Sequence, residues 1–224
     1  QEYENTKHPK LLNLISQYKN KQMALKIALN SAYGAIGNQY FRFYDIRIAE
    51  AVTYGGQLSI RWIEIALNKY LNELLKTEDV DYILASDTDS VYITFESLVE
   101  KLQPKDPVKF LDTICNETIE KFIGGKYQEL ADYTNAYEQK MVMGREVIAD
   151  KGIWTAKKRY ILNVHNSEGV QYAEPKLKMM GIEAVKSSTP QICRDKIKDA
   201  LKLIISGDEK DLNTFIQDFR KEWL

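Results

Sequence analysis

The sequence predicts an α+β fold, in which helices pack on a mixed or antiparallel sheet. Residues 10–35 and 46–75 each repeat apolar side chains at helical spacing, and so does the segment after Pro190. Short runs of β-branched and aromatic residues, separated by turn residues, lie between these helical segments. Strands flanked by helices at both ends of a chain without internal repeats are typical of the α+β class.

Length and composition limit the classes of protein to which the chain can belong. Its 224 residues make one large domain or two small ones, and 44% hydrophobic residues are enough for a buried core. The formal net charge of −1 excludes a globally basic nucleic-acid binder, so any phosphate contact must come from a local patch. Cys115 and Cys193 lack metal-site spacing. Without a membrane-length apolar run or a signal peptide, we expect a cytoplasmic protein.

Two long helices are expected before the first strand. Apolar residues follow helical spacing from 10 to 35, and Gly34 and Gly37 are stop signals at the end of this segment. The second helix is expected at 46–75, where Gly55–Gly56 marks a weak point or a close-packing site.

The middle of the chain is expected to form a hairpin and a third helix. The runs 80–85 and 91–95 are rich in β-branched and aromatic residues, and a short polar turn separates them. A loop marked by two prolines follows. The third helix is expected at about 108–133, with Gly124–Gly125 as its break.

Strands and then helices are expected in the last third of the chain. Ser or Thr as N-cap, with Pro190 as the first helical residue, predicts a helix that Gly207 ends, and a last helix follows. A domain boundary is expected near Ser187. The expected strands are 141–143, 147–148, 160–164 and 176–180.

The polar turn Asp87–Ser90 is the most informative part of the sequence. Asp87 and Asp89 are two residues apart, so in an extended chain their carboxylates project to the same side. Two carboxylates on a hairpin are hard oxygen ligands suited to Mg²⁺, and ions held in this way support nucleotidyl transfer. Turns also favour Asp and Ser for local hydrogen bonds, so the pair alone does not decide between a metal site and a plain turn.

A polar stripe is expected on the first helix. Lys26, Asn30 and Tyr33 fall at i, i+4 and i+7 and therefore share one face. A cation, an amide and a phenol suit a triphosphate, a sugar edge and a base pair, and Gly34 would let a ligand approach closely. The alternative interpretation is an exposed polar face of an amphipathic helix.

A cluster of cations begins the strand expected at 160–164. In a strand, Lys157 and Arg159 would face one way and Lys158 the other, and this basic edge could follow a nucleic-acid backbone. The alternative is an edge strand whose charges prevent aggregation. Glu146 is either a further carboxylate near the metals or a member of an ordinary ion pair.

The segments 26–34, 87–90 and 157–160 resemble, in this order, the motif set of the family B DNA polymerases. More narrowly, the chain is similar to replicative polymerases of T-even-type bacteriophages. Residues 38–45 resemble their sequence just after the fingers helix, and 187–190 resembles the join of palm to thumb. The similarity covers nearly the whole chain.

The resemblance implies a DNA-directed DNA polymerase that adds deoxynucleotides to a primer 3′-hydroxyl with two Mg²⁺ ions. It implies that Asp89 bridges the ions and that Asp87 assists it, so both are expected to be catalytic and metal-binding. Glu146 resembles an acidic residue near the metals.

The resemblance also implies the substrate contacts, with primer–template DNA and deoxynucleoside triphosphates as partners. Lys26 would contact the triphosphate, Asn30 would support the phosphate tail, and Tyr33 would pack against the nascent base pair. The expected DNA-binding residues are Gly34, Lys157, Lys158, Arg159 and Tyr160.

The implied domains are part of the fingers (1–37), the C-terminal part of the palm (38–187) and the start of the thumb (188–224). The palm-type sheet would carry a protruding fingers helix and thumb helices. The family's other catalytic aspartate, in an Asp-x-x-Ser-Leu-Tyr-Pro motif, is absent from this sequence. We therefore expect little polymerase activity from the chain alone. A second polypeptide that supplies the N-terminal palm and the exonuclease is one way to restore it.

Two other classes of function stay open at this point. A non-catalytic DNA-binding or assembly module derived from a polymerase palm would keep the basic strand without making DNA. A generic α+β protein whose motifs are coincidental would bind neither duplex DNA nor divalent ions.

Overall fold

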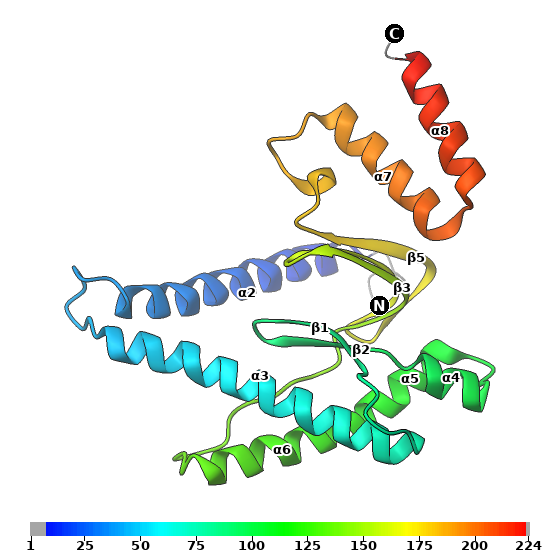
Figure 1. The fold of residues 1–224 in the computed structure, drawn as a ribbon. Helices are drawn as coiled ribbons and strands as arrows, with labels where there is room; N and C mark the ends of the chain where they lie inside the picture. Colours follow the sequence, from blue (N-terminus) through cyan, green and yellow to red (C-terminus); the bar gives the residue numbers. More distant parts are fainter. Residues whose placement is uncertain (1–7, 223–224) are drawn as a thin grey trace. The chain divides into compact units, whose positions relative to one another are not determined.

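The computed structural model describes residues 8–222, which form helices and two small antiparallel sheets (Figure 1). The chain divides into two compact units, Gln1–Arg61 and Trp62–Leu224, and the division falls inside a helix. It does not coincide with the borders expected at 37/38 and 187/188, which stay predictions. The outermost residues of the expected fingers and thumb segments lie outside the described residues.

The first unit contains helix α2 (Pro9–Ile36) and the first half of α3 (Ile46–Leu75), as the sequence predicts. Pro9 is the first residue of α2, where the N–H that proline lacks would have no partner in the helix. α3 begins after Asp45, whose Oδ1 accepts the backbone N–H of Arg47 at 3.0 Å. The weak point expected at Gly55–Gly56 does not interrupt α3.

The second unit contains helices α4 (Glu96–Leu102), α5 (Pro107–Ile114) and α6 (Glu120–Tyr133), and a π-helical turn at Cys115–Ile119 joins α5 to α6. The expected helix at 108–133 is thus present, but the break expected at Gly124–Gly125 is wrong. α4 was not expected, because its seven residues are too few to establish a helical period.

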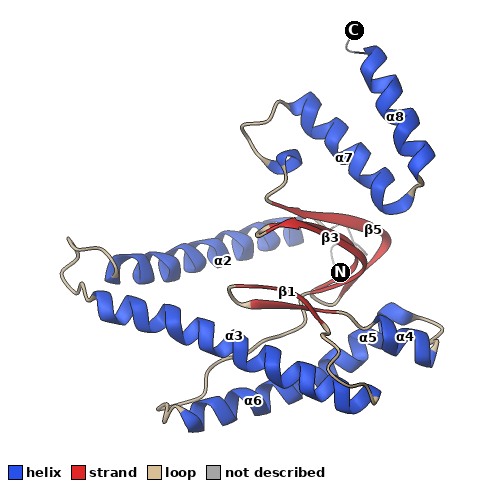
Figure 2. Cartoon of the chain, viewed as in Figure 1, coloured by secondary structure: helices blue, strands red, loops and turns tan. Residues whose placement is uncertain are grey.

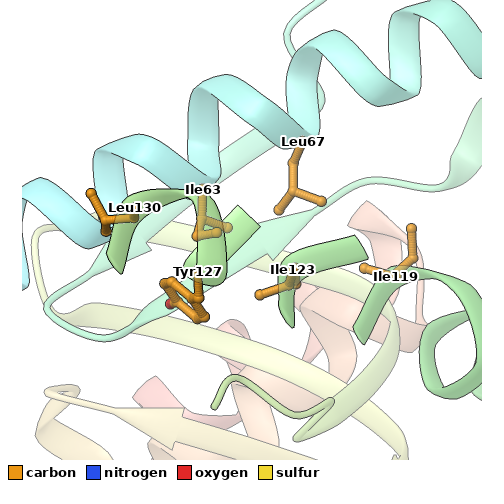
Figure 3. Packing of buried hydrophobic residues seen from close by; sticks show 6 residues of the cluster. All are labelled: Ile63, Leu67, Ile119, Ile123, Tyr127 and Leu130. Carbon is orange, nitrogen blue, oxygen red and sulfur yellow. The ribbon is translucent and has the colours of Figure 1, made fainter. Parts of the chain in front are cut away.

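The second half of α3 packs on α6 to form the main core of this unit, as Figure 3 shows. Ile63 and Leu67 of α3 are fully buried. Truncating either side chain to alanine is expected to cost about 2–5 kcal/mol. The cluster consists of Ile63, Leu67, Ile119, Ile123, Tyr127 and Leu130.

The expected hairpin is formed by β1 (Ile83–Asp87) and β2 (Ser90–Ile93), which pair antiparallel. Asp87 pairs with Ser90, so Thr88 and Asp89 alone form the turn. Thr88 has a φ of 57°, the positive sign that the favoured two-residue hairpin turns have at their first central residue.

The second sheet contains β3 (Val147–Ala156), β4 (Arg159–Ser167) and β5 (Val170–Met180) in that order. Figure 2 labels β3 and β5 of this sheet. The strand expected at 141–143 is wrong, because those residues form an irregular segment before β3. β4 lies in the centre and is buried on both faces: Tyr160, Leu162 and Val164 belong to one cluster and Ile161 to another.

Helices α7 (Gln191–Ser206) and α8 (Glu209–Glu222) end the described chain. Gly207 ends α7 as predicted, but Pro190 is the N-cap, one residue later than expected. A short 3₁₀ turn at Glu183–Val185 links β5 to this region. Among the helices within residues 8–222, none has the length and apolar character needed to cross a membrane.

Candidate active site

The acidic turn, Asp87–Ser90, ends the first hairpin. Asp87 is the last residue of β1 and its side chain is 31% exposed, whereas Asp89 is exposed in the turn itself. The Asp89 N–H donates to the Asp87 carbonyl oxygen at 2.6 Å. Asp89 lies in the turn and not in extended chain, so the expected alignment of the two carboxylates by strand alternation is wrong.

The basic turn, Ala156–Arg159, ends the hairpin of β3 and β4. Ala156 pairs with Arg159, so Lys157 and Lys158 form a two-residue turn, and Lys158 has a φ of 60°. The expected alternation of these cations along a strand is therefore wrong. Both lysines are exposed, while Arg159 forms an ion pair with Glu183 of the 3₁₀ turn.

Gly181, just after β5, fits tightly against the basic turn. Its φ is 66°, and a Cβ atom at this position would lie 2.2 Å from the Lys158 carbonyl oxygen. A contact that short is impossible, so only glycine allows the chain to pass here. The backbone of the basic turn is thus fixed from one side.

The acidic and basic turns meet through a side-chain contact. Lys158 Nζ lies 3.4 Å from Asp87 Oδ1, and the Thr88 hydroxyl donates to the same oxygen at 3.0 Å. The Lys158 side chain is 61% exposed, so this ion pair adds little to stability. Its importance is positional, because it places the acidic turn next to the exposed lysines of the basic turn.

An aromatic cluster packs beneath these turns. Tyr92 of β2 meets Trp154 and Tyr160 edge to face, with ring centroids 5.4 and 5.5 Å apart. Burial and the hydrogen bond with Tyr160 raise the pKa of the Tyr92 hydroxyl to about 12. Tyr160 is only 6% exposed, so its ring supports the basic turn from within the protein. Gly152 makes room for Trp154, since a Cβ there would lie 2.7 Å from the indole.

Asp89 and Glu146 line one open cavity of about 910 Å³ in the second unit, together with Asp150 and His165. Glu146 Oε1 lies 2.6 Å from Lys178 Nζ of β5, so Glu146 forms the ion pair that the plainer interpretation expected. Within residues 8–222, no group of three His, Cys, Asp or Glu side chains is close enough to hold a metal. The described part of this unit therefore offers two aspartates of one turn without a complete ligand set.

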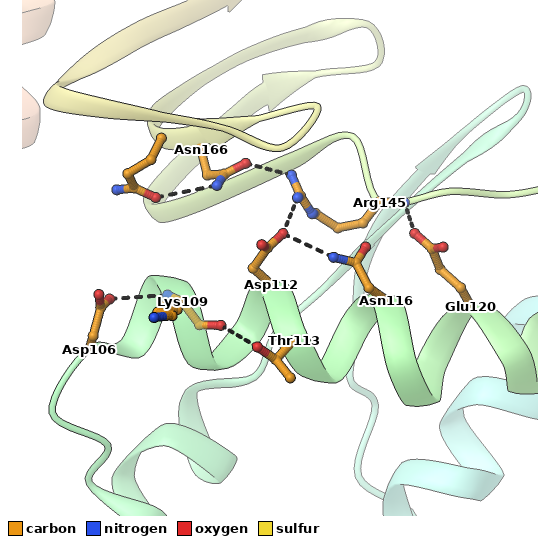
Figure 4. Close-up of polar contacts among 9 residues, drawn as sticks. Asp106, Lys109, Asp112, Thr113, Asn116, Glu120, Arg145 and Asn166 are labelled. Carbon is orange, nitrogen blue, oxygen red and sulfur yellow. Dashed lines mark hydrogen bonds and ion pairs between the residues drawn. The ribbon is translucent and has the colours of Figure 1, made fainter. Parts of the chain in front are cut away.

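Arg145 anchors the chain just before Glu146, as Figure 4 shows. Its side chain is 8% exposed and forms an ion pair with Asp112 of α5. Its guanidinium also donates to Asn166 Oδ1 at 2.7 Å, and its backbone N–H donates to Glu120 Oε1 at 2.6 Å. These contacts tie helices and sheet together and fix the start of β3.

The π-helical turn between Asp112 and Glu120 explains how both carboxylates reach Arg145. In an uninterrupted α-helix, positions eight residues apart differ by about 80° around the axis. The wider π turn rotates each residue less, so Glu120 comes back toward the face of Asp112. Such turns are frequent near functional sites.

The residues expected to bind a nucleotide lie on α2, in the first unit. Lys26, Asn30 and Tyr33 are exposed on this helix. Thr53 donates its hydroxyl hydrogen to a backbone carbonyl of α3, so the Tyr33 hydroxyl is the donor in its 2.9 Å bond to Thr53. A Cβ at Gly34 would meet nothing within 4 Å, so the surface there is open. The acidic and basic turns belong to the second unit.

Comparison with known proteins decides the family. The sequence model of DNA polymerase family B matches residues 5–223. The chain belongs to this family. It is 40% identical to the DNA-directed DNA polymerase of Enterobacteria phage T4 over 216 residues, which are 90% of this chain and 24% of that polymerase. It is 41% identical to the enzyme of Escherichia phage RB69 over 202 residues, 84% of this chain and 22% of that one.

More distant family B polymerases match shorter segments. The catalytic subunit of mouse DNA polymerase alpha is 34% identical over 85 residues, which are 38% of this chain and 5% of that subunit. The chain thus spans about a quarter of the length of the phage polymerases that it matches.

Several residues that shape this part of the chain were not assigned a role in the site from the sequence. The sequence contained a signal for Gly152, because an isolated glycine inside a strand often marks a place where another group approaches the backbone closely. Arg145 carried none, since its partners Asn166 and Asp112 are 21 and 33 residues away. Tyr92 looked like one aromatic residue among several in a strand.

Proposed function

We propose that this chain is the part of a DNA-directed DNA polymerase that carries one acidic side of the metal site, a DNA-holding turn and a nucleotide-contacting helix. The complete polymerase would join a deoxynucleoside triphosphate to a primer 3′-hydroxyl on template DNA. Because two of the relatives are phage polymerases, it would act in the cytoplasm of an infected cell.

The observation that carries the proposal is the meeting of the acidic and basic turns, with Lys158 Nζ 3.4 Å from Asp87 Oδ1. A polymerase has to hold its metal ligands beside the DNA backbone, because the reacting hydroxyl belongs to the DNA. Carboxylates supply the ligands and lysines supply sequence-independent phosphate contacts. One unit of this chain brings both kinds of group together.

The donors near the acidic turn suit Mg²⁺ in kind but are too few. Asp87 and Asp89 offer hard carboxylate oxygens, and Asp87 already lies beside a cation. Together with Glu146, which shares a cavity with Asp89, they would hold two ions only with carboxylates from outside residues 8–222. When bound, the ions would activate the 3′-hydroxyl and stabilise the charge on the phosphates.

The chain's own residues would then position the substrates. Lys26 would neutralise charge on the triphosphate, Asn30 would support the phosphate tail, and Tyr33 would pack on the nascent base pair beside Gly34. The hydrogen bond from Tyr33 to Thr53 would hold the phenol ring in one orientation.

The basic turn would hold the primer–template duplex. Lys157 and Lys158 are its exposed cations and would contact backbone phosphates. Arg159 and Tyr160 would complete the DNA-binding set indirectly, since Arg159 pairs with Glu183 and Tyr160 is buried.

A primer-extension assay tests the catalytic part of the proposal. The purified chain alone is expected to give no templated synthesis. Adding a polypeptide that carries the Asp-x-x-Ser-Leu-Tyr-Pro segment and the exonuclease is expected to restore it. Robust synthesis by the chain alone would contradict the idea that its acidic site is incomplete.

Metal binding tests the acidic turn separately. Mn²⁺ binding to the purified chain, measured by electron paramagnetic resonance, is expected to weaken at least tenfold in Asp89→Ala. The matched control Asp199→Ala, on α7, is expected to bind as the wild type does. Equal affinities in all three proteins would instead favour the non-catalytic module.

DNA binding tests the basic turn. Lys157→Ala combined with Lys158→Ala is expected to weaken duplex binding for all sequences alike and to reduce the salt slope by about 1–2. The control is Lys198→Ala combined with Lys202→Ala, on α7, which changes the net charge by the same amount as the test variant. A loss confined to one DNA sequence would count against backbone contacts.

Nucleotide contact is tested once a partner polypeptide restores activity. Lys26→Ala is expected to lower the rate of incorporation more than the affinity for DNA. Lys21→Ala, on another face of the same helix, is the control. Equal losses of rate and DNA affinity in Lys26→Ala would argue against a phosphate role.

A further inference from the structure

We propose that the Lys158 ammonium occupies the cation position at Asp87 and leaves it when a DNA phosphate binds the basic turn, so that DNA binding frees Asp87 for a divalent ion. This inference rests on the proposed function, because it assigns a metal to Asp87 and DNA to the basic turn. It adds a coupling between DNA binding at the basic turn and metal binding at Asp87.

The contacts of Asp87 support an exchange of cations. Lys158 Nζ and the Thr88 hydroxyl both approach Oδ1, at 3.4 and 3.0 Å, and neither contact uses Oδ2. The Asp87 side chain is 31% exposed, so solvent ions can reach it. A divalent ion bound there would lie within a few ångströms of the ammonium and repel it. The two cations therefore compete for one carboxylate.

The basic turn is built so that only its side chains need to move. Gly181 passes so close to the turn that a Cβ atom there would lie 2.2 Å from the Lys158 carbonyl oxygen, and the pairing of Ala156 with Arg159 closes the turn. The lysine stem is flexible and its head is a point charge with three rotatable donors. Within residues 8–222, Asp87 is the ion-pair partner of Lys158. A phosphate oxygen can replace that partner without any change in the backbone.

The exchange predicts that DNA and metal reinforce each other. A phosphate that draws Lys158 away removes a positive charge from the metal position and leaves a carboxylate free. By linkage, the metal must raise the affinity for DNA by the same factor. Lys157 belongs to the same turn, but the ion pair with Asp87 is made by Lys158, so Lys157 would hold DNA without affecting the metal.

The first experiment measures Mn²⁺ affinity of the purified chain by electron paramagnetic resonance without DNA. Lys158→Met keeps the apolar stem and removes the charge, and is expected to bind Mn²⁺ about three- to tenfold more tightly. Lys157→Met is the matched control and is expected to stay within twofold of the wild type. Asp87→Asn is expected to bind at least tenfold more weakly.

The second experiment repeats the titration with a short primer–template duplex at a concentration that saturates each protein. The duplex is expected to tighten Mn²⁺ binding by the wild type and by Lys157→Met about threefold or more, and to leave Lys158→Met unchanged. Asp87→Asn with the same duplex measures the Mn²⁺ that the DNA itself binds.

The outcomes separate the inference from the proposed function. Equal Mn²⁺ affinities of Lys158→Met and Lys157→Met, with binding still lost in Asp87→Asn, would overturn the exchange and leave the metal role of Asp87 intact. The exchange would also be overturned if the duplex changed Mn²⁺ affinity equally in the wild type, Lys157→Met and Lys158→Met. Unchanged binding in Asp87→Asn, or no binding by any of the four proteins up to millimolar Mn²⁺, would overturn both proposals.

Discussion

The rings of Tyr92 and Trp154 meet edge to face, with centroids 5.4 Å apart. Tyr92 belongs to the strand that follows the acidic turn, and Trp154 belongs to the strand that precedes the basic turn. The ion pair between the turns is exposed and weak, whereas aromatic contacts contribute about 0.5–1.5 kcal/mol beyond burial. Ring packing, more than charge, therefore holds the two turns together.

Replacing the Tyr92 ring should destabilise the second unit. Tyr92→Ala removes contacts with both Trp154 and Tyr160 and is expected to lower the free energy of unfolding by about 2–4 kcal/mol. Tyr92→Phe keeps the ring and loses only the hydroxyl, for an expected cost of about 1 kcal/mol. Urea unfolding measures both variants. Equal costs would show that the hydroxyl, rather than the ring, joins the two sheets.

Alkaline pH should weaken the fold partly through the Tyr92 hydroxyl. Its pKa rises from 10.0 to about 12 in the folded state, chiefly because burial disfavours the phenolate. The folded state then holds the proton more tightly than the unfolded chain does. The stabilisation that this pKa difference gives the folded state is complete below about pH 10. It is lost as the pH rises toward about 12.

The Tyr92→Phe variant provides the measurement of this effect. Without the hydroxyl, the variant is expected to lose less stability than the wild type between about pH 9 and 11, as followed by urea midpoints. An equal loss of stability in the two proteins would mean that the pKa of this hydroxyl is the same in the folded and unfolded states.

Gly181→Ala should disturb the basic turn. A Cβ at this position would lie 2.2 Å from the Lys158 carbonyl oxygen, so the turn must shift, and duplex binding is expected to fall several-fold with a loss of about 2–4 kcal/mol in stability. Gly169→Ala is the matched control, because Gly169 also has a positive φ but a Cβ there would meet no atom within 4 Å. It is expected to cost about 1 kcal/mol and to leave DNA binding intact.

Asp112→Ala should expose the dependence of β3 on the Arg145 contacts. Removing this carboxylate leaves a guanidinium that is 8% exposed without its ion-pair partner, and is expected to cost about 2–4 kcal/mol. Asp106→Ala, at the N-cap of the same helix, is expected to cost about 1 kcal/mol. Thermal or urea unfolding compares them. A loss for Asp112→Ala no larger than for Asp106→Ala would show that Arg145 finds other partners.

The helices and the paired strands were predictable because their signals are local. Helical spacing located 10–35 and 46–75 to within a residue at each end, and the flanking apolar runs located the acidic turn. The break expected at Gly124–Gly125 failed because glycine inside a packed helix is tolerated, and α6 is held by Ile123 and Tyr127 on either side.

The candidate site was predictable in composition but not in geometry. Residue types indicated that carboxylates and lysines matter, yet both turns are two residues long, so the strand alternation assumed for Asp89 and Lys158 does not apply. The contact between Asp87 and Lys158 joins two hairpins that are far apart in sequence, and no local pattern encodes it. The role of Gly181 depends on the same long-range approach.

Helix α2 has 28 residues, and none of its side chains is buried. A helix without buried contacts opens at a low cost in free energy, and its amides should exchange with deuterium faster than those of the α3 residues that pack on α6. If Lys26, Asn30 and Tyr33 receive a nucleotide, part of the binding free energy must go into ordering this helix. Nucleotide affinity should then decline steeply on warming, and deuterium uptake along α2 should slow only when the ligand is present.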